Sequence, residues 1–559
     1  MNSPMIKKLC GILDKASSFK AKKRTLIIVF ILYIILLSTI AYFHEPWFDE
    51  AQAWQISRCA SLSDILFKIP HYEGHPPLWH LILLPFAKTG MPYEFSLAFV
   101  NIVFSAAAVW IIMFKTKLPD LMRLTLPFTY FFFYQYGVIS RPYSLMAFAL
   151  MLCAVFYREK SQKPVRMVLS LALLCLSSAY GLAIAAGICV VWLIEEWNGK
   201  NVFSFIKDFI KTKTFFCLSG LLVLAILIFI PIIPYKDAFG VNTSGRNKNI
   251  IGNLCYTLFV LPYDTTVGNY FCYDAEHLDF QFDMMFPLYL IISLLIVAVM
   301  YFFGKKHNCT RMIYIQFVYI PIIFAAALMF AHHIGISTMF LVFWLCICFD
   351  TEKPVLNLGK YDTALHYIFT VSACLFILVQ ISWTASSSVI DIKYNYASGR
   401  EMAQYITENN LEDAKLMSSW HLSAGPNYSE ENEEKYYNFN SSGAGTAILP
   451  YLDKNVFVNF NWGLDNMGYT EHRDILDIDE YEQTIKRFEE LGVPDYFFGM
   501  ITNANYALDN IHGHPFYIVH SVEYCMVFKN SYVKSYDVIY KFDDLENFLK
   551  EVTEDEGTD

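Results

Sequence analysis

Successive apolar runs are the feature that most limits what this chain can fold into. Runs of about 16–23 residues, the first at 25–43, recur between short segments that carry Lys and Arg. A helix needs ~20 residues at 1.5 Å each to cross the hydrocarbon core of a bilayer. Hydrophobic residues make up 55% of the 559-residue chain and charged residues only 17%. We therefore predict an α-helical polytopic membrane protein.

The basic segments between the runs predict how the chain crosses the membrane. The basic N-terminus, 1–24, should stay cytoplasmic, which sends the loop 44–75 to the outer face. Segment 76–90 conflicts with simple alternation, because a full crossing there would leave Lys115 and Lys117 outside. We interpret it as short, tilted or re-entrant. About eleven transmembrane helices and an outer C-terminus follow. The remaining runs are 95–114, 119–139, 142–157, 167–196 (two short helices turning near Tyr180), 214–234, 284–303, 312–331, 334–349 and 363–384.

The composition changes to that of a soluble domain at about 385. Helical and extended patterns then alternate, which predicts an extracytoplasmic α/β domain over 385–550. An acidic tail, 551–559, ends the chain. The expected elements are a helix at Arg400–Asn409, a strand at Val456–Phe460, a helix at Tyr481–Leu491 and a strand at Tyr496–Phe498.

Several classes of function receive no support from the sequence. The net charge is −10 and no basic run lies outside the short loops, so a nucleic-acid partner is not indicated. No C-x-x-C pair suggests a zinc or redox site. Cys255 and Cys272 share one predicted outer loop and would form a disulfide only if that loop faced an oxidising compartment. A Gly-rich phosphate loop is also missing, which argues against a nucleotide-sugar donor.

An acidic pair, Asp49-Glu50, stands just beyond the first apolar run, and Arg58 follows it. Charged side chains near a membrane are expensive unless they meet water or partners, so they are functional candidates. An aspartate there can act as a general base toward an acceptor hydroxyl. Two adjacent carboxylates would also suit a divalent cation. From charge alone, two solvated loop acids would be the simpler interpretation.

Three further motifs fall on the same predicted outer face and give the acidic pair a context. Asp49-Glu50-Ala51 comes first, and the others are His75-Pro76-Pro77-Leu78, Arg141-Pro142-Tyr143 and Ala331-His332-His333-Ile334-Gly335. In this order they resemble the GT-C superfamily of polytopic glycosyltransferases. The resemblance covers about 25–385. It is nearest to the bacterial branch related to protein O-mannosyltransferases and lipid A aminoarabinose transferases.

That resemblance implies an enzyme of the bacterial cell membrane. It would transfer a sugar from a polyprenyl-phosphate donor to an extracytoplasmic glycan, lipid or protein, with inversion. Asp49 matches the position of the catalytic base, and Glu50 is its neighbour in the acidic pair. No resident cofactor is implied, and a divalent cation at Asp49 and Glu50 stays an option. The residues expected near the donor or its phosphate are Arg58, His75, Arg141, Tyr143, His332 and His333.

Other interpretations of the same residues remain open. Arg58 and Arg141 would also suit the membrane interface, where their stems bury and their charges reach water. Trp47 and Trp79 fit an interfacial aromatic belt as well as a sugar-stacking wall. A transporter or flippase of lipid-linked sugars is the alternative function. It would require ionisable residues deep within the spans, and these runs carry almost none.

Overall fold

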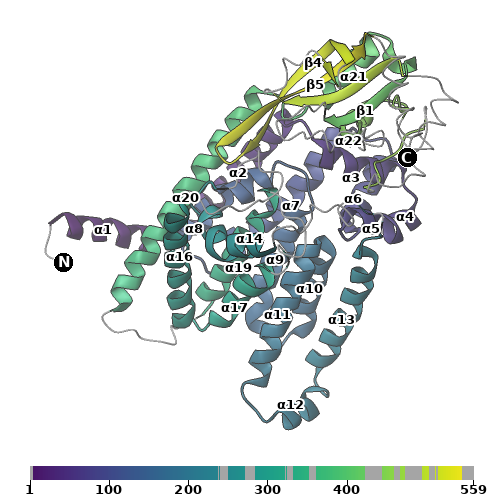
Figure 1. Cartoon of the computed structure of the whole chain (residues 1–559). Coiled ribbons are helices and arrows are strands. Elements are labelled where there is room, and N and C mark those ends of the chain that lie inside the picture. The colour runs from purple at the N-terminus through teal and green to yellow at the C-terminus, as the bar shows by residue number, and fades with distance from the viewer. Residues whose placement is uncertain are drawn as a thin grey trace.

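The computed structural model describes residues 4–236, 238, 250–270, 284–321, 323, 331–351, 361–421, 443–458, 466–472, 494–502, 510–511 and 514–543. Its helices form one large bundle, and a small sheet covers one end of that bundle (Figure 1). Within the described residues, seven helices are long and apolar enough to cross a membrane. They are α2 (Lys23–Phe43), α7 (Tyr93–Lys115), α11 (Ala179–Trp197), α13 (Lys213–Ile232), α16 (Phe286–Lys306), α19 (Gly335–Phe349, continuous with Ala331–His333) and α20 (Tyr361–Lys393). The protein is a helical membrane protein.

The segment 76–90 is short, as predicted. It forms α6 (Leu78–Lys88), and 11 residues span only about 16 Å. Lys88 Nζ donates to the carbonyls of Arg58 at 2.8 Å and Ala60 at 3.3 Å. The next helix, α7, starts with the ring of Tyr93 lying 5.5 Å from that of Trp54. The C-terminal end of α6 and the start of α7 therefore lie near the helix that carries the acidic pair.

The predicted turn within 167–196 is also confirmed. Helix α10 (Pro164–Ser177) ends one residue before Ser178, and α11 starts one residue after it. The Ser178 hydroxyl accepts the N–H of Gly181 at 2.9 Å and so caps α11. A Cβ at Gly181 would collide with the carbonyl of Leu174, so only glycine fits this close approach.

The predicted run 119–139 is not one continuous helix. It contains α8 (Asp120–Thr125), a 3₁₀ turn (Leu126–Phe128) and a π-helical turn (Phe131–Gln135). Pro127 lies within this irregular stretch and has no N–H for a regular helix. Helix α9 (Tyr143–Phe156) follows. The irregular backbone delivers Ser140 and Arg141 to the acidic pair.

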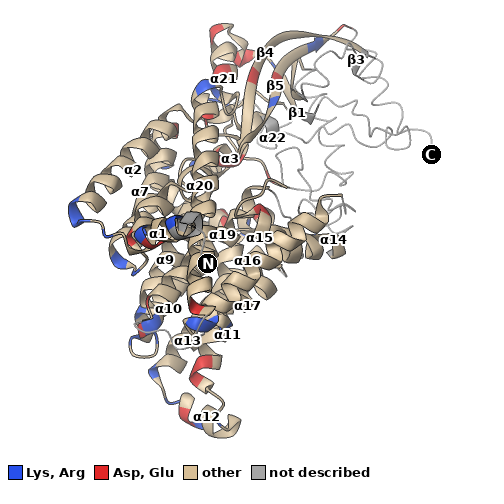
Figure 2. Ribbon diagram, turned by 90° about the vertical axis from the view of Figure 1, so that its left-hand side faces the viewer, with Lys and Arg blue, Asp and Glu red and all other residues tan. Residues whose placement is uncertain are grey.

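Basic residues gather where helices end away from the sheet, as Figure 2 shows. Contacts join several of these ends. Lys117 pairs with Asp350 at 2.8 Å, and Lys306 pairs with Asp362 at 3.0 Å. Helix α1 (Pro4–Ser18), which the sequence analysis did not predict, also lies here, because Tyr367 donates to Asp14 at 3.2 Å. Helix α12 (Val202–Phe209) connects α11 and α13 at this end.

The loop 44–75 forms three short helices, α3 (Phe48–Cys59), α4 (Leu62–Phe67) and α5 (Ile69–Glu73). In α3, Glu50–Ser57 are all buried. The Gln52 amide accepts the N–H of Thr470 at 3.0 Å, and Gln55 donates to the carbonyl of Gly468 at 3.1 Å. Helix α3 is therefore enclosed by α6 and by a segment of the C-terminal region.

The C-terminal region starts later than predicted, because α20 continues to Lys393 rather than ending near 384. Helix α21 (Gly399–Glu408) confirms the helix expected at Arg400–Asn409. Its buried Met402 and Ile406 share a core with Leu416, Phe498 and Ile539 of the sheet. This region is thus a packed helix-and-sheet layer.

The five-stranded sheet has the order β1-β2-β5-β4-β3. Its strands are β1 (Leu416–His421), β2 (Tyr496–Thr502), β3 (Asn510–Ile511), β4 (His514–Phe528) and β5 (Ser531–Phe542). Only β1 and β2 are parallel. Strand β2 confirms the prediction at Tyr496–Phe498. The strand predicted at Val456–Phe460 is reduced to one bridge between Phe457 and Leu416 in its described part. The predicted helix Tyr481–Leu491 and tail 551–559 lie outside the described residues, as does Cys272.

Candidate active site

The acidic pair occupies the first turn of α3, where the positive end of the helix dipole favours carboxylates. Adjacent residues on a helix point about 100° apart, so the two side chains diverge. Asp49 turns toward Arg141, and Glu50 turns toward the buried end of α2. The pair therefore separates into two different environments.

Asp49 and Arg141 form a direct ion pair between Oδ2 and Nη1. The Arg141 side chain is 13% exposed and that of Asp49 is 24% exposed, so the pair is still reachable from outside. The guanidinium carbon lies 5.9 Å from the ring centre of Trp47 and 5.6 Å from that of Tyr143. Two aromatic rings thus flank the cation and fix its place beside the carboxylate.

Glu50 is completely buried and both of its oxygens are occupied. Oε2 faces His44 Nε2 at 3.0 Å and accepts the N–H of Trp47 at 3.2 Å. Oε1 accepts the N–H of Ser140 at 2.5 Å. Because Ser140 immediately precedes Arg141, Glu50 joins the start of α3 to the backbone that carries the cation. We therefore assign Glu50 a positioning role in place of the predicted catalytic one.

His44, which the sequence analysis did not select, bridges two carboxylates. Its Nδ1 lies 3.0 Å from Asp391 of α20, and Asp391 also accepts the hydroxyl of Tyr134 at 3.0 Å. Burial alone would lower the pKa of His44, but Asp391 and Glu50 outweigh it and raise the pKa to about 10. A protonated His44 thus holds α2, α3 and α20 together.

The two histidines of the 331–335 motif take different positions. The ring of His332 lies 6.0 Å from that of Trp47 and 6.4 Å from that of Tyr143, so it belongs to the Arg141 cluster. The carbonyl of His332 accepts the hydroxyl of Tyr136 at 2.7 Å. His333 is buried and shares a 3.0 Å hydrogen bond with Tyr180. His332 therefore lies among the residues around Arg141, whereas His333 is held in the interior by Tyr180.

His75 lies between α5 and α6. Burial lowers the pKa of His75 to about 4. The imidazole is therefore neutral at pH 7. It can offer a hydrogen bond to a ligand, but it cannot supply the positive charge that a phosphate-holding role would use.

Arg58 is not part of this group. It lies nine residues after Asp49 on α3, which is a rise of about 13 Å. Its Nη1 approaches the carbonyl of Leu452 in the C-terminal region at 3.5 Å. The predicted role of Arg58 near a donor phosphate therefore does not fit its place at the far end of the helix.

Two buried polar atoms on the rings that flank Arg141 have no partner within the described part of the chain. They are Trp47 Nε1 and Tyr143 Oη. Buried polar groups in proteins are almost always hydrogen-bonded, and each unpaired one costs about 1–3 kcal/mol. Trp47 can only donate, Tyr143 donates readily, and both flank a guanidinium. This arrangement suits an anionic oxygen ligand.

The residues do not fit the optional divalent cation. Among the described residues, no group of three or more His, Cys, Asp or Glu side chains could hold a metal. Glu50 faces N–H donors with both oxygens, and Asp49 points away from it. The two carboxylates therefore do not form a shared oxygen cage.

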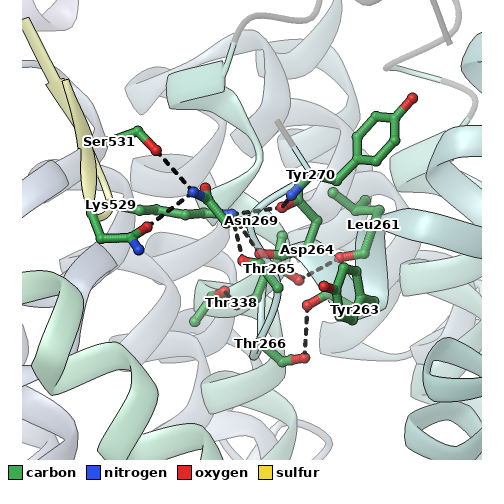
Figure 3. Close-up of polar contacts among 12 residues, drawn as sticks. Leu261, Tyr263, Asp264, Thr265, Thr266, Asn269, Tyr270, Thr338, Lys529 and Ser531 are labelled. Atoms are coloured by element: carbon green, nitrogen blue, oxygen red, sulfur yellow. Dashed lines mark hydrogen bonds and ion pairs between the residues drawn. The ribbon is translucent and has the colours of Figure 1, made fainter. Parts of the chain in front are cut away.

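A second polar cluster lies at the tip of the hairpin between β4 and β5, drawn in Figure 3. Lys529 inserts its ammonium group into the helical body and pairs with Asp264 at 2.7 Å, with both side chains at 0% exposure. No sequence motif singled out either residue, because they lie 265 positions apart. Burial lowers the pKa of Lys529, and Asp264 opposes that shift.

In comparisons with known proteins, no family model, no curated protein and no solved structure matches the chain.

Proposed function

We propose that this protein is an integral-membrane glycosyltransferase that uses a polyprenyl-phosphate sugar as donor. The observation that carries the proposal is the pairing of two features in one place. A partly exposed carboxylate, Asp49, adjoins a guanidinium, and the rings of Trp47 and Tyr143 flank that guanidinium, each with a buried polar atom that has no partner among the described residues. Sugar transfer from a lipid phosphate needs a base beside a phosphate-binding group.

The chemistry follows from these positions. Asp49 takes the proton from an acceptor hydroxyl as that oxygen forms a bond to C1 of the sugar. The bond from C1 to the phosphate oxygen breaks on the opposite face, so the configuration inverts. The electron pair leaves with the phosphate, and Arg141 stabilises the charge through its several N–H groups. Arg141 then exchanges part of its contact with Asp49 for the phosphate.

The arrangement of the helices is consistent with a transfer reaction on the extracytoplasmic side of the membrane. Counting the shorter pieces α9 and α10 and the runs 119–139 and 312–331 with the seven long helices, we propose about eleven crossings. Basic residues gather at the end away from the sheet, which the positive-inside rule assigns to the cytoplasm. The acidic pair and the C-terminal region then lie on the extracytoplasmic side, in a cell membrane that we propose to be bacterial.

The order of the four motifs, together with the grouping of Asp49, Arg141 and His332, supports membership of the GT-C superfamily. We propose the C-terminal region as the place of acceptor recognition, because its segment 466–472 packs directly against α3. The acceptor would be a glycan, a lipid or a protein.

A transfer assay in native membranes tests the proposal. Radiolabelled polyprenyl-phosphate sugars are screened for transfer to endogenous acceptors in membranes that contain the protein. Asp49→Asn should reduce the transfer at least 100-fold, since general-base catalysis contributes about 10²–10⁴-fold. Asp64→Asn serves as the matched control, because Asp64 lies in the same loop and its carboxylate accepts the hydroxyl of Ser61 at 2.7 Å.

Two results would contradict the proposal. Equal transfer by the Asp49→Asn and Asp64→Asn proteins would remove Asp49 as the base. Movement of labelled lipid across the membrane without any transfer, unchanged in both variants, would favour the flippase alternative instead.

A further inference from the structure

The tip of the β4–β5 hairpin is anchored inside the helical body by a fully compensated ion pair. Lys529 Nζ donates to Asp264 Oδ1 at 2.7 Å, to the Asp264 carbonyl at 2.6 Å and to the Gly268 carbonyl at 3.1 Å (Figure 3). Its ammonium also lies 4.7 Å from the ring centre of Trp383. All three ammonium donors therefore have acceptors in the helical body.

The partner carboxylate is equally well held. Asp264 accepts the hydroxyl of Tyr256 at 2.7 Å and the N–H of Tyr270 at 2.8 Å. Beside the pair, the amide of Asn269 donates to Asn530 and Ser531 of the hairpin, each at 2.9 Å (Figure 3). The backbone of Lys529 has a φ of 58°, the left-handed conformation that a tight hairpin turn requires. The backbone conformation of the hairpin tip thus fits the contacts with Asp264 and Asn269.

The same tip holds the end of α20 through its backbone. The Ser387 hydroxyl donates to the carbonyl of Lys529 at 2.5 Å, and the Ser387 side chain is fully buried. Phe528 packs against Tyr130, with ring centres 5.8 Å apart. Asp391 follows Ser387 by four residues, which places both side chains on one face of the helix.

From Asp391 the contacts continue without a gap to the acidic pair. Asp391 meets His44 at 3.0 Å, His44 meets Glu50 at 3.0 Å, and Glu50 accepts the N–H of Ser140. Asp49 is the residue before Glu50, and Arg141 is the residue after Ser140. One turn of α20 and a chain of buried polar contacts therefore join the hairpin tip to the candidate active site.

We propose that Lys529, Ser387, Asp391 and His44 form a positioning route by which the C-terminal sheet fixes the first turn of α3 and thereby the geometry of Asp49 and Arg141. None of the four touches the reacting atoms. The coupling between the hairpin and α3 is independent of any activity, and its importance for sugar transfer rests on the proposed function.

Hydrogen–deuterium exchange of the full chain in lipid nanodiscs tests this route without a substrate. The reporter amides are those of Glu50 and Ala51, which bond to the carbonyl of Trp47 at 3.0 Å. Ser387→Ala removes one hydroxyl that links the hairpin to α20. It should make these amides exchange about fivefold faster, the effect of losing about one hydrogen bond of stabilisation. Exchange in α7 and α19 should be unchanged.

Three companion variants make the result specific. Ser387→Thr keeps a hydroxyl and should restore the protection of Glu50 and Ala51. Ser382→Ala, on the same helix, removes a hydroxyl that bonds only locally to Val379 and should have no effect on α3. His44→Gln breaks the middle of the route, so it should loosen α3 while the amides of 527–531 stay protected.

Protection at Glu50 and Ala51 that is unchanged in Ser387→Ala would overturn the proposal. So would a uniform rise of exchange across α7 and α19, which indicates general destabilisation, or a failure of Ser387→Thr to restore α3. If the route is confirmed while Asp49→Asn retains full transfer activity, the proposed function fails and the positioning route stands.

Discussion

Two of the aspartate–cation pairs in the described structure have opposite surroundings. Asp264–Lys529 is sealed at 0% exposure, and the cation and the carboxylate are each surrounded by further hydrogen-bond partners. Asp49–Arg141 is partly exposed, and two polar atoms beside it, Trp47 Nε1 and Tyr143 Oη, lack partners in the described structure. A satisfied pair holds elements together, whereas an unsatisfied one has capacity for a ligand. The difference separates a structural anchor from a candidate active site.

Replacing the cation of each pair should give the largest difference in the free energy of unfolding between the two sites. Lys529→Met leaves Asp264 buried and unpaired, so we expect a loss of about 3–5 kcal/mol in the free energy of unfolding. Arg141→Met leaves a carboxylate that water reaches, so the loss should be about 1 kcal/mol or less. Reversible unfolding in detergent measures both. Lys534→Met, which breaks an exposed pair with Glu523 on the same hairpin, is the control. Equal losses of unfolding free energy in Lys529→Met and Arg141→Met would refute the distinction between a structural pair and a candidate active-site pair.

The bridge at His44 adds a pH dependence to the link between the two regions. The folded pKa is about 10, above the ordinary 6.5, so the stabilisation is complete below pH 6.5. It should be lost as the pH rises from 6.5 to about 10. Wild-type protein should lose a few kcal/mol more than His44→Gln over that range, since each pKa unit corresponds to about 1.4 kcal/mol. The measurement is unfolding at several pH values, and parallel profiles would show that His44 is neutral when folded.

Two tyrosines give a smaller and more selective test of the comparison. Tyr256→Phe removes a hydroxyl bonded to Asp264 and should cost about 1.5–3 kcal/mol, as for a hydrogen bond to a charged group. Tyr143→Phe removes an unpaired buried hydroxyl and should leave the stability unchanged or raise it by up to about 1 kcal/mol. Thermal unfolding of the two variants under the same conditions measures both changes in stability. A loss at Tyr143 as large as that at Tyr256 would mean that its hydroxyl is already satisfied.

The sequence predicted the helices around the Asp49–Arg141 pair well, because the sequence signals for these helices are local. Apolar length predicted the long helices, and the charges flanking 76–90 predicted that its helix is short. Asp49 and Arg141 were both selected, and they are in contact. The turn near Tyr180 was also readable, since Ser178 and Gly181 supply a helix cap and a close approach.

The failures are contacts between residues far apart in sequence. The roles of Glu50 and His44 depend on Asp391, which lies 347 positions from His44. The long hairpin places Lys529 beside Asp264, and no periodic pattern indicates that pairing. Arg58 was grouped with Asp49 by sequence proximity, yet nine residues of helix separate their side chains. His75 was expected near the donor or its phosphate, and the burial that keeps its imidazole neutral cannot be inferred from a loop position.

Direct binding of a polyprenyl phosphate tests the central claim most closely. The full-length protein in nanodiscs is titrated with the lipid phosphate, and its affinity is compared for wild type, Arg141→Met and Arg58→Met. Because a charge-assisted contact to an anion contributes about 1.5–3 kcal/mol, Arg141→Met should weaken binding by about 10- to 100-fold. Arg58→Met should bind as the wild type does. Equal affinity in all three proteins, or a loss at Arg58 alone, would contradict the assignment of the Asp49–Arg141 cluster as the donor site.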